Sequence, residues 1–575
     1  MNNIQKTLSI AITGSGGSGV VTMGMLFLKA IAGAGYYGLM TRSSGPQIRG
    51  GESAVMLRLG ANPVLCQDDS FDILLALDWF NFSRFADEIP LTAQSVVLYD
   101  PAMEELPPEI IDSGAQLKEI SLKLLAKTIS GCRPNMLALG MLAALLDIDK
   151  SAVENAINAV LGNKGAEVVK PSINAVNTGF AAVPKSMKLH RLPPAQATFT
   201  HWNISGNEAA GLGALRGGVR LVAAYPITPA SEVLEWMAPN LEKIGGTLIQ
   251  AEDELASINM VIGASFGGVP ALTATSGPGL SLMMEALGLA TASETPLVVI
   301  NVMRGGPSTG IPTKSEQTDL NIALYGLHGD APHLVLAPVN IGDCAFTTEW
   351  AIRLAERLQT VAIVLSDQSL GQSRAIIDPP QIAPVVEQRS TVTTACESYQ
   401  RYALTDDGIS QMAIPGTAGC IYTADGLEHT AEGIPSSMAS DHQQQLQKRL
   451  NKLIQYDYGE QWAEQDGDGE VCLITWGSSS GVVKEAAQRL RADGLAVKTL
   501  AIRLLSPLPE QPFHTAVQKG KYLVVIEQNH QGQLFHYLNS LNLLPDGTRV
   551  LAHPGPLPIR PGEVVDFVKE SYSDE

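Results

Sequence analysis

Three Gly-, Ser- and Thr-rich loops each follow an apolar, β-type run and carry side chains suited to binding an anion. YPITPASE (225–232) presents Thr228 between two prolines, while TATSGPG (273–279) and RGGPSTG (304–310) follow two other runs, the second with Arg304. Because open α/β sheets bind ligands at the carboxyl ends of their strands, we expect these loops to form a polar rim over an apolar cleft. A hydroxyl and a guanidinium there suit a carboxylate. Thr228 could instead cap the following helix.

Three acidic residues precede an apolar helical pattern in EDELASINMVIGAS (252–265). Carboxylates at a helix N-terminus are common because they interact favourably with the helix dipole, so this segment alone indicates no chemistry. Successive residues of a helix point in different directions. We therefore expect Glu252 and Asp253 to point away from the direction taken by Glu254.

A further Gly-rich loop, GSGGSG (14–19), separates a β-type run from a helical pattern near the N-terminus. Glycine lets backbone N–H groups approach a phosphate at a helix N-terminus, but a structural turn explains these residues equally well. Residues 36–50 contain no Asp or Glu to hold a ribose, which argues against NAD. The loop SGPQIRGGES (44–53) contains Arg49, which can bind a phosphate or carboxylate or simply be solvated.

The composition excludes several classes of protein. The 575 residues include 39 Lys and Arg against 58 Asp and Glu, a net charge of −19, which argues against nonspecific nucleic-acid binding. The six cysteines form no CxxC pair, so we expect no zinc or iron–sulfur ligand set and a cytoplasmic protein with reduced thiols. The uncharged run at 8–28 is interrupted by GSGGSG and reads as strand, turn and helix rather than a membrane segment.

Alternating β-type and helical patterns predict an α/β protein with three doubly wound domains. In the first block, the run at 8–13 predicts a buried strand, and the pattern at 135–160 predicts helix broken near 147–150. A linker rich in Pro follows at 182–198. We expect α/β domains at 1–184, 199–380 and 470–575, and a polar wrapping linker at 381–469 in which QQQLQKRLNKL (443–453) forms a surface helix.

Together these segments resemble the α subunit of the 2-oxoacid:ferredoxin oxidoreductases, in the form whose γ domain is fused ahead of the α domains. The resemblance covers nearly the whole chain, follows the family's order and is nearest to the 2-oxoglutarate enzymes. GSGGSG and SGPQIRGGES are similar to the γ domain. The pyrimidine-side thiamine domain is matched by YPITPASE, EDELAS…IGAS, TATSGPG, RGGPSTG…EQTDL and YGLHGD, and the transketolase-C-like domain by WGSSSG (476–481), LLSPLP and VIEQNHQGQL (525–534).

The resemblance implies oxidative decarboxylation of a 2-oxoacid, with CoA as acyl acceptor and ferredoxin as electron acceptor. For 2-oxoglutarate the products are succinyl-CoA and CO2, and the reaction is reversible, as in the reductive TCA cycle. It also implies thiamine diphosphate shared with a β subunit that holds the diphosphate, Mg²⁺ and a 4Fe-4S cluster, in an α2β2 heterotetramer. Ferredoxins are usually acidic, so we expect ferredoxin to dock on the β subunit rather than on this acidic chain. No metal ligands are expected in this chain, and GDGE (467–470) is expected to be a simple turn.

Matching this sequence to the family's motifs implies roles for individual residues. Glu254 is the expected catalytic acid, hydrogen-bonded to N1′ of the pyrimidine. Thr228 and Arg304 are expected to bind the substrate carboxylate. The expected thiamine diphosphate contacts also include Tyr225, Pro226, Ile227, Ser276 and Gly277.

Weaker matches extend the predicted sites. Ser308, Thr309 and Lys314 are candidates for a second substrate carboxylate, although a solvated role for Lys314 remains open. His328 is a candidate substrate contact or a structural histidine. By analogy with the family's γ domain, the CoA phosphates are expected at Gly14, Gly16, Gly17, Gly19 and Arg49.

Three alternatives stay open at this point. The chain can serve a pyruvate or branched-chain 2-oxoacid oxidoreductase, since these enzymes share the motifs. An NAD-type dehydrogenase built on GSGGSG is a second possibility, which the missing ribose acid disfavours. A non-catalytic scaffold is a third, which the presence of Glu254 and Arg304 disfavours.

Overall fold

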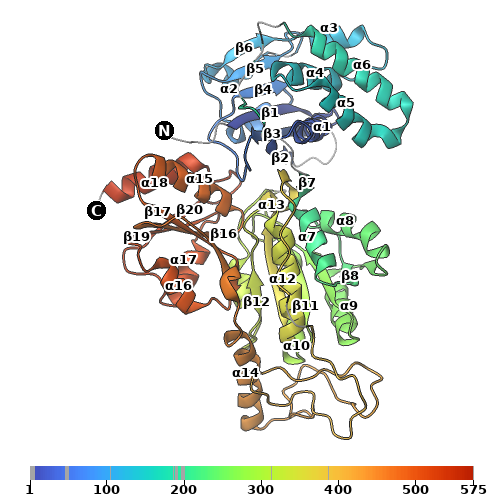
Figure 1. The fold of residues 1–575 in the computed structure, drawn as a ribbon, viewed down its shortest axis with the longest axis vertical. Helices are drawn as coiled ribbons and strands as arrows, with labels where there is room; N and C mark the ends of the chain where they lie inside the picture. The colour runs from blue at the N-terminus through green and yellow to red at the C-terminus, as the bar shows by residue number, and fades with distance from the viewer. Residues whose placement is uncertain are drawn as a thin grey trace. The chain divides into compact units, whose positions relative to one another are not determined.

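The computed structural model describes residues 7–45, 51–103, 105–184, 187, 189, 192–195, 201–311, 314–385 and 388–573. They form three β-sheets flanked by helices (Figure 1), which confirms the predicted α/β class. The chain divides into two compact units, the first comprising Met1–Ile204, Ser373–Pro379 and Leu557–Val565, and the second the remainder. The four sequence boundaries given above stay predictions.

The first unit contains a mixed sheet in the order β6-β5-β4-β1-β3-β2-β14-β7. From β6 to β1 the strands are parallel, as expected for alternating strands and helices, whereas β3 is antiparallel to both β1 and β2. Only seven residues join β2 to β3, too few for the crossover that parallel neighbours need. The strands are β1 (Thr7–Ser15), β2 (Tyr37–Ser44), β3 (Glu52–Gly60), β4 (Ile73–Ala76), β5 (Val96–Tyr99), β6 (Gln116–Glu119), β7 (Trp202–Ser205) and β14 (Arg374–Ile377).

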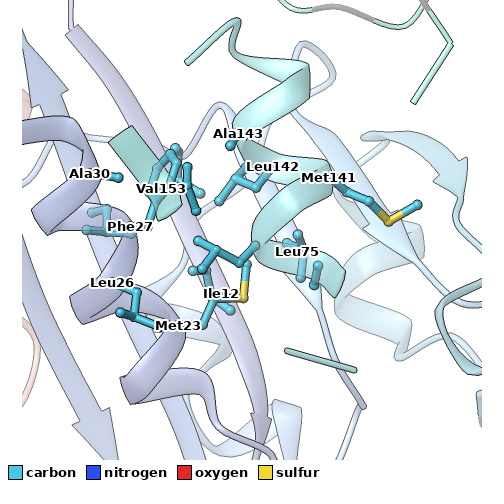
Figure 2. Packing of buried hydrophobic residues seen from close by; sticks show 14 of the residues in the cluster. Ile12, Met23, Leu26, Phe27, Ala30, Leu75, Met141, Leu142, Ala143 and Val153 are labelled. Carbon is cyan, nitrogen blue, oxygen red and sulfur yellow. The ribbon is translucent and has the colours of Figure 1, made fainter. Parts of the chain in front are cut away.

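Helices pack on one face of this sheet and form its larger core. Alternate residues of a strand face opposite sides, so Ile10 and Ile12 of β1 join this core while Ala11 joins the other. Figure 2 shows side chains of β1, β4, α1, α4 and α5 meeting in it. The helices of this unit are α1 (Val20–Gly33), α2 (Pro108–Asp112), α3 (Leu122–Lys127), α4 (Pro134–Leu145), α5 (Lys150–Leu161) and α6 (Ala166–Ala182), so the predicted helix break near 147–150 is confirmed.

The second sheet, in the second unit, has the order β18-β12-β13-β11-β10-β8-β9. Its strands are parallel except β18, which is antiparallel to β12. They are β8 (Leu221–Ala224), β9 (Thr247–Gln250), β10 (Ala271–Thr275), β11 (Leu297–Met303), β12 (Leu334–Leu336), β13 (Val361–Asp367) and β18 (Leu504–Ser506). The helices are α7 (Gly206–Arg216), α8 (Ser231–Glu242), α9 (Glu254–Phe266), α10 (Gly277–Ala292), α11 (Leu320–Tyr325), α12 (Asp343–Leu358) and α13 (Gln368–Gln372).

The third sheet lies in the same unit, in the order β15-β17-β16-β19-β20. Only β15 is antiparallel to its neighbour, and Gly467 lies in the left-handed region between β15 and β16, so GDGE is a turn as expected. The strands are β15 (Ala463–Asp466), β16 (Val471–Trp476), β17 (Val497–Ile502), β19 (Tyr522–Glu527) and β20 (Arg549–Ala552). The helices are α15 (Ser479–Ala492), α16 (Glu510–Val517), α17 (Gln533–Ser540) and α18 (Pro561–Ser573).

Helix α14 (Ala439–Ile454) occupies the predicted surface-helix segment, but one of its faces is buried. Lys448 Nζ donates to Glu294 Oε1 at 2.6 Å, and Lys452 Nζ donates to Glu294 Oε2 at 2.8 Å. Arg401 donates to the Glu294 backbone carbonyl at 2.8 Å, and all four residues are at most 4% exposed. The predicted surface helix is therefore present, and its buried face carries lysines that bind a buried carboxylate, which the sequence did not indicate.

Candidate functional site

The three polar loops predicted to form one rim follow neighbouring parallel strands. Residues 225–228 follow β8, residues 276–279 follow β10, and Arg304 follows β11. Since β8, β10 and β11 are parallel neighbours, their carboxyl ends meet at one edge of the sheet. Tyr225, Pro226 and Thr228 are exposed there and Ile227 is half-buried. The predicted convergence of the loops is therefore observed.

Thr228 and Arg304 are in direct contact across this edge. The Arg304 Nη1 group donates to the backbone oxygen of Thr228 at 2.9 Å, and burial lowers the pKa of the guanidinium, partly offset by Asp319. Its Nε group is buried and has no hydrogen-bond partner among the described residues. Helix α8 starts at Ser231 with Ala230 as its N-cap and no side-chain cap, so the alternative role of Thr228 as the cap is wrong. The geometry leaves Arg304 with donor capacity for an anion.

Glu254 begins helix α9 and is only 7% exposed, whereas Glu252 and Asp253 are exposed. The Asp253 side chain accepts from the Ala256 backbone N–H at 2.7 Å and so caps the helix. Within the described ranges, no hydrogen bond or ion pair reaches the Glu254 carboxyl group. The carboxyl oxygens are not among the fully buried unpaired atoms of the described residues, so the group is open to a ligand.

The turn beside Glu254 provides a cradle for such a ligand. A Cβ atom at Gly279 would lie 2.7 Å from Glu254 Oε1 and 2.1 Å from Thr275 Oγ1, so only glycine lets α10 approach the carboxyl so closely. The Ser276 hydroxyl at the start of α10 is buried and lacks a hydrogen-bond partner in the described part of the chain. An unpaired carboxyl and an unpaired hydroxyl fit an aminopyrimidine, which carries nitrogen donors and acceptors.

A cavity of about 500 Å³ lies beside this turn. Its wall is formed by the start of α10, the loop after β11, residues 316–322 and residues 529–533 of the loop after β19. The polar groups that face it include Arg304, Ser308, Glu316, Asp319 and His530. The sequence predicts no role for Glu316, Asp319 or His530, although they lie in the EQTDL and VIEQNHQGQL motifs.

The remaining predicted substrate contacts lie at different places. Ser308 lines the cavity, while Thr309 is exposed in the same loop and does not line it. The backbone oxygen of Lys314 accepts from Gly305 N–H at 2.9 Å, which closes the loop after Arg304. His328 is exposed, and the described residues of the cavity do not include it.

Gln317 joins the second sheet to the third. Its amide nitrogen donates to the Trp476 backbone oxygen at 2.9 Å, and its amide oxygen accepts from Ser479 Oγ at 3.0 Å and Gln528 N–H at 2.7 Å. Its own backbone N–H donates to the Gln528 oxygen at 2.8 Å. We call Gln317 together with Trp476, Ser479 and Gln528 the Gln317 clasp. The EQTDL, WGSSSG and VIEQNHQGQL motifs are thus in direct contact in the folded chain.

The GSGGSG loop, which is expected to bind the CoA phosphates, makes several hydrogen bonds and packing contacts within the protein. The Ser15 backbone N–H and hydroxyl both donate to Asp78 Oδ2, at 3.0 and 2.8 Å, and Gly16 N–H donates to the Gly51 oxygen. A Cβ at Gly19 would lie 2.2 Å from Asn135 Nδ2, so packing accounts for that glycine. These contacts account for the loop as a structural turn, and the CoA phosphate site at Gly14, Gly16, Gly17 and Gly19 stays a prediction. Arg49 lies outside the described residues.

In the ranges that the structure describes, no group of three or more His, Cys, Asp or Glu side chains is arranged to hold a metal ion. Over the same ranges, no helix combines the length and the apolar character needed to cross a bilayer.

Comparison with known proteins places these sites in a family. Residues 212–448 match the family described as pyruvate flavodoxin/ferredoxin oxidoreductase, thiamine diP-bdg, residues 9–182 match pyruvate ferredoxin/flavodoxin oxidoreductase, and residues 469–543 match pyruvate:ferredoxin oxidoreductase core domain II. The first match contains Thr228, Glu254 and Arg304.

The chain is also similar to whole proteins. It is 38% identical to the 2-oxoglutarate:ferredoxin oxidoreductase of Magnetococcus marinus, solved with 2-oxoglutarate, coenzyme A and succinyl-CoA bound, with a TM-score of 0.91 over 99% of this chain and 100% of that one. It is 30% identical to the 2-oxoacid:ferredoxin oxidoreductase subunit alpha of a Sulfolobus species, over 92% of this chain and 91% of the relative. It is 37% identical to the 2-oxoglutarate synthase subunit KorA of Archaeoglobus fulgidus, over 57% of this chain and 87% of the relative. The chain belongs to the α subunits of the 2-oxoacid:ferredoxin oxidoreductases, in the form with a fused γ-like domain.

Proposed function

We propose that this chain is the α subunit of a CoA-acylating 2-oxoglutarate:ferredoxin oxidoreductase that converts 2-oxoglutarate to succinyl-CoA and CO2. The observation that carries the choice of substrate is the similarity over its full length to an enzyme with 2-oxoglutarate, coenzyme A and succinyl-CoA bound. A β subunit supplies the diphosphate site, Mg²⁺ and a 4Fe-4S cluster, and the complex is an α2β2 heterotetramer.

In this proposal, Glu254 and the turn at Ser276 and Gly277 hold the pyrimidine ring of thiamine diphosphate. The cofactor, when bound, supplies a nucleophilic carbon and accepts the electron pair left by CO2. The Glu254 carboxyl group holds a proton at the pyrimidine nitrogen, in a site where burial excludes competing water. Tyr225, Pro226 and Ile227 lie at the same sheet edge and complete this side of the site.

Thr228 and Arg304 hold the carboxylate next to the 2-oxo group. Arg304 is anchored by the bond from its Nη1 group to the Thr228 oxygen, and its half-exposed guanidinium keeps further N–H donors for the substrate. A guanidinium and a carboxylate form charge-assisted hydrogen bonds, and an anion also offsets the lowered pKa of the half-buried guanidinium. We assign the second carboxylate of the substrate to Ser308, which lines the same cavity.

The proposal is tested by producing the chain with its β subunit and assaying dye reduction with CoA and a panel of 2-oxoacids. We expect kcat/KM for 2-oxoglutarate to exceed the values for pyruvate and for branched-chain 2-oxoacids. A complex that prefers pyruvate would overturn the choice of substrate. The chain without its partner serves as the control and should be inactive, since half of the site lies elsewhere.

Replacing Arg304 with alanine should raise KM for 2-oxoglutarate by about 100-fold, because losing one partner of a buried charge pair costs about 3 kcal/mol. Steady-state kinetics of the assembled enzyme measures this, and KM for CoA should change little. Arg220→Ala is the matched control, since Arg220 lies at the opposite, amino end of β8. A KM within threefold of the wild-type value would exclude Arg304 from substrate binding.

A further inference from the structure

Glu316 lines the cavity beside Arg304 and has no role in the site described so far. The residue is 7% exposed, and the loop after β11 packs tightly against it, since a Cβ at Gly305 would lie 2.9 Å from Glu316 Oε2. Its carboxyl group accepts one backbone hydrogen bond, from Gly555. A carboxylate has about four lone-pair sites, so it keeps capacity for a further donor in the cavity.

The charged groups around Glu316 come from three segments. Asp319 lies on its own segment, Arg304 on the loop after β11, and His530 on the loop after β19. Burial raises the pKa of the Glu316 carboxyl, Asp319 raises it further, and the Gly555 bond and His530 lower it. A carboxylate that binds protons more readily than usual is a better base near neutral pH.

Asp319 faces the same cavity, but both of its carboxyl oxygens already accept hydrogen bonds. Its Oδ2 accepts from Asn301 Nδ2 at 2.8 Å, its Oδ1 accepts from Thr318 Oγ1 at 3.2 Å, and its charge interacts with Arg304. Asp319 is therefore placed to orient Arg304. Of the two buried carboxyl groups in this wall, Glu316 is the one open to a new proton donor.

The reaction proposed above has one proton step that Glu254, Thr228 and Arg304 leave unassigned. The acyl group passes to the thiol of CoA, and a free thiol has a pKa of about 8.5, so most of it is protonated at neutral pH. Only the thiolate is a good nucleophile. A base near the acyl carbon that the sulfur attacks is therefore required for the thiol proton.

We propose that Glu316 is this base, with His530 at the exposed side of the cavity passing the proton to solvent. The thiol S–H bond breaks, its proton moves to a Glu316 carboxylate oxygen, and the electron pair left on sulfur forms the bond to the acyl carbon. The bond that joins this carbon to the cofactor would break, and its electron pair would return to the cofactor. The two electrons of the oxidation would leave through the β subunit to ferredoxin. Protonation makes Glu316 neutral, so no second negative charge opposes the thiolate. This assignment rests on the proposed function, because it requires CoA as the acyl acceptor.

The test compares two steps in the assembled enzyme carrying Glu316→Gln. CoA-dependent turnover should fall about 100-fold, within the range typical of general bases. The stopped-flow burst of dye reduction that follows 2-oxoglutarate addition without CoA should keep its rate. Raising the pH from 7 to 9 should shrink the deficit severalfold, because more CoA is then already ionised. Glu242→Gln, on the exposed end of α8, is the control.

Each result has a defined meaning. CoA-dependent turnover within threefold of wild type would overturn the role of Glu316, and so would loss of the burst together with turnover, which indicates a structural role. His530→Gln should reduce CoA-dependent turnover less than Glu316→Gln, with the same preserved burst, and an unchanged rate would remove His530 from the relay. If the wild-type complex itself fails to use 2-oxoglutarate and CoA, the proposed function fails instead.

Discussion

Replacing Glu254 with glutamine is expected to reduce turnover of the assembled enzyme by about 1,000-fold. Glutamine keeps the size of the side chain but cannot hold an ionisable proton at the pyrimidine nitrogen. The position is 7% exposed and the glutamic acid has no other described partner, so little structural role is lost with it. Steady-state dye reduction measures turnover, and calorimetric titration measures whether thiamine diphosphate still binds.

Two neighbouring acids provide matched controls for Glu254. Glu252 is exposed, and Glu252→Gln should leave turnover near the wild-type value. Asp253 caps α9, and Asp253→Asn keeps a capping oxygen while removing the charge next to Glu254, so it should also leave turnover near the wild-type value. If Glu254→Gln turned over at a rate similar to Glu252→Gln, Glu254 would not be the pyrimidine acid.

Removing the Glu294 carboxyl is expected to destabilise the packing of α14 by about 3–5 kcal/mol. Lys448 and Lys452 would remain buried without their counter-ion, and Arg401 already places a third positive charge nearby. Hydrogen–deuterium exchange of α14 in Glu294→Ala measures the effect as faster local opening. Exchange as slow as in the wild type would show that the lysines find other partners.

A triple variant separates unpaired charge from lost packing at this cluster. Glu294→Leu combined with Lys448→Met and Lys452→Met removes the charges and keeps comparable volume. Buried ion pairs can be replaced by packed apolar side chains with little loss, so this variant should exchange more slowly than Glu294→Ala. Equal exchange in both would mean that packing rather than charge holds α14.

The same ion pairs give the cluster a pH dependence. Burial alone would raise the pKa of Glu294, but Lys448, Lys452 and Arg401 outweigh it and hold that pKa well below the ordinary 4.5. Because the folded-state pKa is lower than the unfolded one, this stabilisation is present above pH 4.5 and is lost as the pH falls through the folded-state value. The triple variant should lack this loss in acid.

Local sequence patterns predicted the positions of individual strands and helices well. The apolar run at 8–13 falls within β1, and the helix break near 147–150 falls between α4 and α5. These signals depend on neighbouring residues, through hydrophobic periodicity and chain reversal. The position of β14 beside β2 could not be found this way, because more than 300 residues separate these strands and only the folded sheet pairs them.

Only part of the candidate site could be predicted, because local sequence patterns do not show which distant segments meet in the fold. Thr228 and Arg304 could be brought together because each follows a strand of one parallel sheet. Glu316, Asp319 and His530 could not, since their place in the cavity depends on how the third sheet meets the second. The ion pairs of the α14 lysines could not be predicted, because lysine is seldom buried and its partner Glu294 lies more than 150 residues away.

The Gln317 clasp limits how this chain can be recombined with those of its relatives. One side chain meets partners that lie 159, 162 and 211 positions further along the sequence, and its own segment also carries Glu316 and Asp319. If the backbone of a relative's C-terminal domain lies differently at the positions of Trp476 and Gln528, exchanging that domain on its own would leave the Gln317 amide and those buried polar groups unpaired. The unit that can be exchanged intact is therefore the C-terminal domain together with the EQTDL segment, although the two are far apart in the gene.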